Sequence, residues 1–82
     1  MKLYCLFDKK SGEYSCLSAE KNLAMFERSL AQQINNPRST NLLFTNAVDF
    51  DIYCVGEFDP QTATIVPGVS FVRNCNELKE EM

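Results

Sequence analysis

One helical stripe between two strand-forming regions constrains the fold of this chain most strongly. From Ala19 to about Ile34, apolar residues recur at helical spacing and charged residues lie off that stripe. The stripe consists of Leu23, Phe26, Leu30 and Ile34. Ser18 is the predicted N-cap, and residues 35–37, Asn-Asn-Pro, end the helix because the residue before a proline disfavours helical backbone angles. We therefore predict a single amphipathic helix.

A strand pair is predicted on each side of the helix. Residues 2–7 alternate, residues 8–13 form a turn with a glycine, and residues 14–17 return as a short strand. After the helix, residues 50–58 alternate most clearly, with Phe50, Ile52, Cys54 and Phe58 on the apolar side. A turn at 59–62 leads into a strand at 63–66, and Pro67-Gly68 interrupts this strand. Residues 69–72 either extend the strand or turn a corner.

The order β-β-α-β-β predicts an α+β fold, a small antiparallel sheet of two β-hairpins with one amphipathic helix packed on one face. All 82 residues are expected in one domain, with 75–82 as a short helix or a frayed tail and 37–48 left open between loop and helical turn. A chain this short buries only ~60% of its unfolded surface, so a homodimer is expected to add stability.

Catalytic chemistry has little support in the sequence. Histidine is absent, which removes the commonest general base and the Ser-His or Cys-His nucleophile pairs. Four carboxylates flank the strand at 50–58 and suggest a paired-carboxylate site, but a solvated strand face and a turn cap explain them better: Asp49, Asp51, Glu57 and Asp59. We expect no enzyme activity.

The four cysteines are expected to be reduced, because Cys5 and Cys54 lie inside apolar strand runs and no pair has CxxC spacing. No metal and no cofactor is expected. The start of the chain lacks a signal-peptide pattern and no apolar run approaches the ~20 residues that span a bilayer. These features predict a cytoplasmic protein without membrane contact.

Two binding sites are predicted. Tyrosines beside basic residues on an open sheet face would stack and hold single-stranded DNA, although the net charge of −3 weighs against this: Lys2, Tyr4, Lys9, Lys10, Arg28 and Tyr53. That site requires Tyr4 and Tyr53 to share the face away from the helix; otherwise one or both tyrosines fill the core rim or a dimer interface. The consecutive apolar residues Leu42, Leu43 and Phe44 suggest contact with a protein partner, the alternative being ordinary packing within the chain.

Several segments of the chain resemble one viral family. They are residues 1–4, MKLY, residues 7–14, FDKKSGEY, and residues 53–59, YCVGEFD, with matching helix positions at 21–24, 28–29 and 35–37. Together these segments are similar to the small nonstructural protein of gokushovirus-type Microviridae, small phages with circular single-stranded DNA. The chain departs from that pattern after Asp59, where Gln-Thr-Ala-Thr replaces a common threonine-glycine turn.

The resemblance implies a nonstructural protein made in the infected bacterium, absent from the virion, and acting in viral DNA synthesis or its coupling to packaging. It implies no catalytic residues. Two hypotheses follow: a DNA-handling accessory factor that binds single-stranded DNA, or a module that binds a phage or host replication protein without contacting DNA. The second would use the Leu42 to Phe44 region or an exposed sheet edge.

Overall fold

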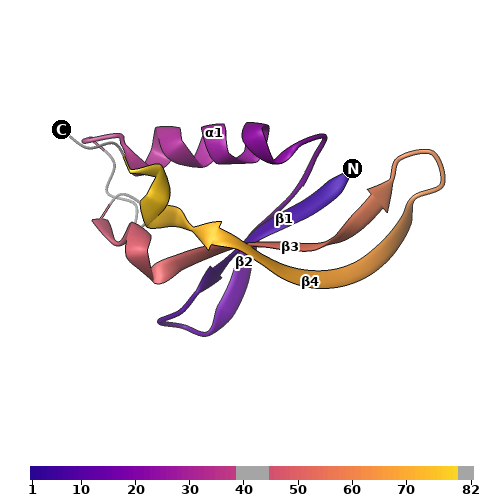
Figure 1. Cartoon of the computed structure of the whole chain (residues 1–82), viewed down its shortest axis with the longest axis horizontal. Coiled ribbons are helices and arrows are strands. Elements are labelled where there is room, and N and C mark those ends of the chain that lie inside the picture. Colours follow the sequence, from indigo (N-terminus) through magenta and orange to yellow (C-terminus); the bar gives the residue numbers. More distant parts are fainter. Residues whose placement is uncertain (39–44, 80–82) are drawn as a thin grey trace.

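The computed structural model describes residues 1–38 and 45–79, which form one four-stranded antiparallel sheet with a helix on one side (Figure 1). The sheet order is β2-β1-β3-β4. The bounds are β1 Lys2–Asp8, β2 Glu13–Glu20, α1 Leu23–Ile34, β3 Phe50–Asp59 and β4 Thr64–Asn74. The predicted fold class and the order β-β-α-β-β are confirmed.

The helix begins later than predicted, and Ser18 is not its N-cap. Residues 18–20 extend β2, where Ser18 is paired with Tyr4 and Glu20 with Lys2. Asn22 caps the helix instead, since its Oδ1 accepts a hydrogen bond from the Met25 N–H at 3.0 Å. The pairing with β1 therefore lengthens the first hairpin at the expense of the predicted first helical turn.

The predicted helical stripe forms the core together with one face of the sheet. Phe26, Leu30 and Ile34 are buried, and Leu23 packs at the edge of the same cluster. The sheet contributes four buried side chains to this cluster: Tyr4, Leu6, Phe50 and Ile52. Phe58, predicted on the same apolar side of β3, is only half-buried, because a register shift near Val55 and Gly56 interrupts the alternation.

Pro67-Gly68 does not end the last strand. β4 continues from Thr64 to Asn74, and Pro67 is paired with Gly56 across a register shift. Proline is tolerated here because β4 is an edge strand, where one N–H faces away from the ladder. Figure 1 shows the β3–β4 hairpin extending beyond the end of α1.

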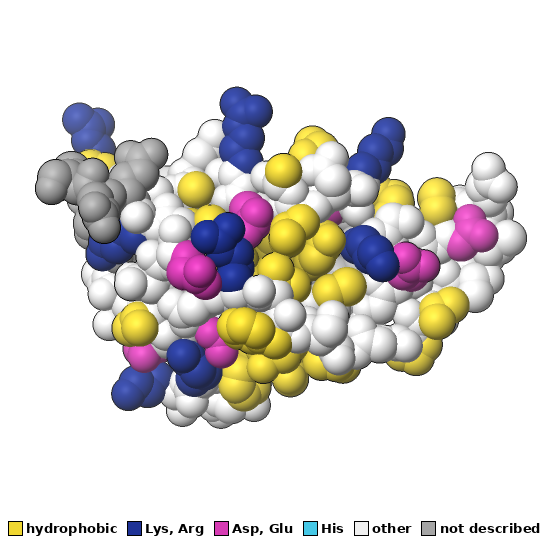
Figure 2. Space-filling model, in the orientation of Figure 1, with side chains coloured by type: hydrophobic (Ala, Val, Ile, Leu, Met, Phe, Trp, Pro, Cys, Tyr) yellow, Lys and Arg dark blue, Asp and Glu magenta, His cyan; other side chains and the backbone are white. Residues whose placement is uncertain are grey.

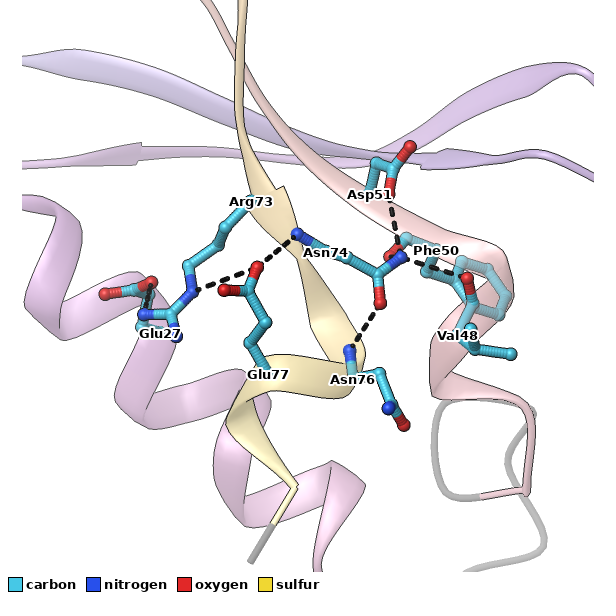
Figure 3. A network of polar contacts seen from close by, with 8 residues as sticks. All are labelled: Glu27, Val48, Phe50, Asp51, Arg73, Asn74, Asn76 and Glu77. Carbon is cyan, nitrogen blue, oxygen red and sulfur yellow. Dashed lines mark hydrogen bonds and ion pairs between the residues drawn. The ribbon is translucent and has the colours of Figure 1, made fainter.

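The end of β4 is tied to the rest of the fold through Asn74 (Figure 3). Its side-chain amide donates to the Val48 and Phe50 carbonyls at 2.9 and 3.1 Å and to Asp51 Oδ1 at 2.8 Å. Its backbone N–H donates to Glu77, which closes a capping box for the 3₁₀ helix at Cys75–Leu78. The part of the predicted tail that the structure describes is thus helical, whereas residues 80–82 lie outside the described residues.

Arg73 connects the same strand end to the helix. Its guanidinium pairs with Glu27 of α1 at 3.0 Å and approaches Glu77 at 3.8 Å (Figure 3). A second 3₁₀ helix, Ala47–Asp49, precedes β3 and buries Ala47 in the core. These contacts connect the end of β4 to α1 and place the segment before β3 in the core.

Candidate binding face

Tyr4, predicted to stack nucleic-acid bases, is instead a core residue. Only 7% of its surface is exposed, and its ring stacks on Phe26 of α1 with centroids 5.4 Å apart. Burial also raises the pKa of its phenol above the ordinary value. Side chains alternate along β1, so Tyr4 and Leu6 both face the helix, and Tyr4 does not share a face with Tyr53 as the predicted DNA site requires.

The predicted phosphate-binding cations do not form one surface either. Lys2 Nζ lies 2.6 Å from Glu57, and Lys9 Nζ lies 3.7 Å from Asp51. The Lys2–Glu57 hydrogen bond raises the pKa of Lys2 and lowers that of Glu57. Arg28 is exposed on α1, on the opposite side of the sheet from Tyr53. Figure 2 shows Lys and Arg side chains along the upper edge, over α1, and others scattered below.

Tyr53 lies on the other face of the sheet, in a cluster of four aromatic rings that we name the aromatic row. Its members are Tyr14 of β2, Phe7 of β1, Tyr53 of β3 and Phe71 of β4. Ring centroids are 4.6 Å apart for Phe7 and Tyr14, 5.5 Å for Tyr14 and Tyr53, and 5.8 Å for Tyr53 and Phe71. Each strand contributes one ring, so the row crosses the whole sheet.

The face that carries the aromatic row, which we call the open face, is apolar beyond the rings. Cys5 is paired with Tyr53 and is buried beneath a shallow hollow of about 280 Å³ lined by Tyr14, Ser15, Leu17 and Val55. Leu17 and Val69 are about two-thirds exposed, and Tyr14 and Phe71 are 52% and 58% exposed. Figure 2 shows hydrophobic side chains along the lower edge, on the side of the strands away from α1.

Asp51 and the lysines of the β1–β2 turn bring charge to one end of the open face. The Asp51 carboxylate is 13% exposed and is held by Asn74 and Lys9, while Lys10 lies in the turn itself. Residues 60–72, which include most of β4, carry no charge. A face of this kind binds through apolar and aromatic contact rather than through ion pairs.

The carboxylates of β3 do not form a pair. Asp51 contacts Asn74 and Lys9 near one end of the strand, whereas Glu57 contacts Lys2 six residues further along. Asp59 accepts a hydrogen bond from the Gln61 N–H, which lowers the pKa of its carboxyl. Each of these carboxylates therefore has a structural contact of its own: Asp59 caps the turn as predicted and Glu57 is solvated, whereas Asp51 is mostly covered.

The four cysteines are free thiols, and two of them, Cys5 and Cys75, are buried. Burial raises the pKa of Cys5 and raises that of Cys75 to about 12. Among residues 1–38 and 45–79, no three cysteine or carboxylate side chains are grouped so as to hold a metal ion. No helix in the described part of the chain is long and apolar enough to cross a membrane.

The predicted partner-binding residues Leu42, Leu43 and Phe44 lie outside the described residues. The aromatic row, by contrast, was found only in part from the sequence, since Tyr53 was singled out and Phe7, Tyr14 and Phe71 were not. The signal for them is cross-strand pairing: Phe7 is paired with Tyr14 and Tyr53 with Phe71.

A family model described as Phage ORF5 protein matches residues 1–78. The chain belongs to this family. It is therefore a bacteriophage accessory protein, in agreement with the broader part of the sequence resemblance. No curated protein and no solved structure matches the chain. The residues of the open face, from Cys5 to Phe71, all lie within the part of the chain that the family model covers.

Proposed function

We propose that this phage protein is a nonenzymatic accessory factor that supports synthesis of single-stranded viral DNA, or its coupling to packaging, through protein contacts made by its open face. The observation that carries the proposal is the aromatic row, which crosses all four strands on the face that α1 leaves uncovered. Exposed apolar patches rimmed by polar residues mark interaction sites in soluble proteins. The proposed partner is a phage or host replication protein.

Charge favours a protein partner over DNA. Affinity for single-stranded DNA comes largely from lysines and arginines that neutralise phosphates. Here Lys2 and Lys9 are already paired with Glu57 and Asp51, and the chain carries a net charge of −3. Aromatic and apolar side chains without a basic surround are typical of the centre of a protein interface.

The sequence resemblance supplies the biological setting of the proposal. We assign the protein to the gokushovirus-type Microviridae, made in the cytoplasm of the infected bacterium and absent from the virion. The resemblance implies no catalytic residues, and the contacts that explain each β3 carboxylate support a nonenzymatic role.

Direct binding of single-stranded DNA is a second candidate, favoured by one observation. The turn that carries Lys9 and Lys10 immediately follows Phe7 and precedes Tyr14, so two cations lie at one end of the aromatic row. In this alternative Tyr14, Tyr53 and Phe71 stack on bases and the turn contacts phosphates. Tyr4 has no part in it.

Two measurements test these functions. In infected cells, Tyr53→Ser and Phe71→Ser should lower the yield of single-stranded genome, whereas Met25→Ser on the exposed side of α1 should not. Equal yields for all three variants would refute a role for the open face. Fluorescence anisotropy of a labelled single-stranded oligonucleotide, with duplex as control, separates the candidates: steeply salt-dependent binding indicates DNA, and no binding at low salt leaves the protein partner.

A further inference from the structure

The two edge strands contribute little to the core of the single chain. No residue of β2 or β4 is buried, and Thr64 to Phe71 are all exposed. Helix α1 covers the face opposite the open face, and the buried sheet residues there belong to the central strands β1 and β3. An antiparallel sheet with one face in water normally carries polar side chains on that face, so an open face of aromatic and aliphatic residues is a surface suited to contact.

The side chains that a second layer would cover are large and apolar. Tyr14 and Phe71 are each more than half exposed, which leaves roughly 100 Å² of each ring in water. Leu17 and Val69, each about two-thirds exposed, enlarge the patch. With four strands about 4.8 Å apart, the sheet offers a face of roughly 20 by 30 Å, comparable to one side of a standard interface of ~800 Å² per partner.

The distribution of charge makes this face compatible with a copy of itself. A two-fold contact places the same patch of each subunit against its counterpart, so any net charge in the patch would oppose its own sign. The chain carries a net charge of −3, yet residues 60–72 are uncharged and Asp51 is paired with Lys9 at the margin. The open face is thus a region where two acidic copies can meet with little repulsion.

We propose that the occupant of the open face is a second copy of this chain, packed sheet against sheet with the two aromatic rows interleaved. The dimer would have four layers in the order helix, sheet, sheet and helix, with the two sheets about 10 Å apart. This inference rests on the proposed function in one respect, that the open face makes a protein contact. It adds the identity of the first protein bound there.

Sedimentation velocity over a concentration series tests the proposal, with Phe71→Glu as the disrupting variant and Met25→Glu as the matched control. Met25 is 57% exposed, almost the same as Phe71, but lies on α1. Wild type and Met25→Glu should dimerise alike, and Phe71→Glu should raise the dissociation constant by roughly 30-fold or more, as expected for a hot-spot residue. A wild type that remains monomeric at roughly 100 μM, or a Phe71→Glu protein that dimerises like wild type, would overturn the proposal.

A measurement on the unaltered protein guards against misfolding of the variant. The chain has no tryptophan, so tyrosine fluorescence reports on Tyr14 and Tyr53 of the open face and on buried Tyr4. Acrylamide should quench this fluorescence more strongly on dilution, because the dimer dissociates and exposes Tyr14 and Tyr53. Quenching that does not change with concentration across the sedimentation range would count against the dimer.

The outcomes also separate this inference from the proposed function. If the wild type is monomeric but Phe71→Ser still lowers the single-stranded genome yield, the open face binds another protein or DNA and the second-copy proposal is wrong. If Phe71→Glu abolishes a dimer while Phe71→Ser leaves the genome yield unchanged, the dimer stands and the proposed function falls.

Discussion

The two faces of the sheet are both apolar, but only one is covered. On the helix side, Tyr4 and Ile52 are buried beneath Phe26 and its neighbours in α1. On the other side, the aromatic row is less covered: Tyr14 and Phe71 at its two ends are more than half exposed, and Phe7 and Tyr53 are only partly buried. The comparison teaches that this short chain uses one face of its sheet for its own stability and keeps the other available for contact.

The largest difference between the two faces is expected when one phenylalanine on each face is replaced. Phe26→Ala removes a buried ring and should lower the free energy of unfolding by about 3–5 kcal/mol. Phe71→Ala, measured at high dilution, should lower it by less than about 1 kcal/mol, because the ring is mostly in water. Urea unfolding followed by circular dichroism measures both. Equal losses would mean that the two faces contribute equally to the folded monomer.

A second test concerns the polar contacts at the end of β4. Asn74→Ala removes the amide that contacts Val48, Phe50 and Asp51, and should cost roughly 2 kcal/mol, since each net hydrogen bond contributes about 0.5–1.5 kcal/mol. Asn76→Ala is the matched control, because Asn76 donates a hydrogen bond to Asn74 Oδ1 from its backbone N–H, which this substitution keeps. Thermal unfolding of the two variants side by side measures the difference, and a loss as large for Asn76→Ala would contradict the assignment.

Alkaline titration distinguishes the tyrosines of the two faces. Burial raises the pKa of Tyr4 above its ordinary value of 10.0, so the folded state retains that proton while the unfolded state releases it. Stability should therefore fall as the pH rises above 10, and the fall should be smaller in Tyr4→Phe. Ultraviolet difference spectra should show a late-ionising phenol in the wild type and in Tyr53→Phe. If the late-ionising phenol persists in Tyr4→Phe, it belongs to another tyrosine.

The smallest expected effect belongs to the exposed Lys2–Glu57 pair. The hydrogen bond from Lys2 lowers the pKa of Glu57 below 4.5, so its contribution is present above that pH and is lost as the pH falls through the lowered pKa. The carboxyl carbon shift of Glu57, followed by NMR, should titrate at higher pH in Lys2→Met than in the wild type. An unchanged titration midpoint would show that the ion pair does not persist in solution.

How much of this structure could be predicted from the sequence depends on how distinct the two sides of each element are. The helical stripe is unambiguous because charged residues occupy the other side of α1, and its buried positions were predicted correctly. β1 is apolar on both sides, with Cys5 and Leu6 equally buried on opposite faces, so alternation alone does not show which side the helix covers. That ambiguity left two alternatives for Tyr4, base stacking or the core, and the structure places it in the core.

The start of the helix was missed for a related reason. Ser18 and Asn22 are both good N-cap residues, and only the long-range pairing of Ser18 with Tyr4 decides between them. The aromatic row likewise depends on cross-strand registers, which are set by bulges and turns that a single-sequence pattern does not display. Local features were therefore predicted well, and pairings between distant segments were not.

Gly56 has a consequence for how this protein family can vary. A Cβ at this position would lie 2.5 Å from the Val66 carbonyl oxygen, and the backbone φ of +155° disfavours any other residue. Gly68, in the strand opposite, has nothing within 4 Å of an added Cβ. Neighbouring positions of this hairpin therefore differ in how freely they can change during evolution: exposed Glu57 can be exchanged at little cost to the fold, whereas glycine is the one residue that position 56 accepts without strain.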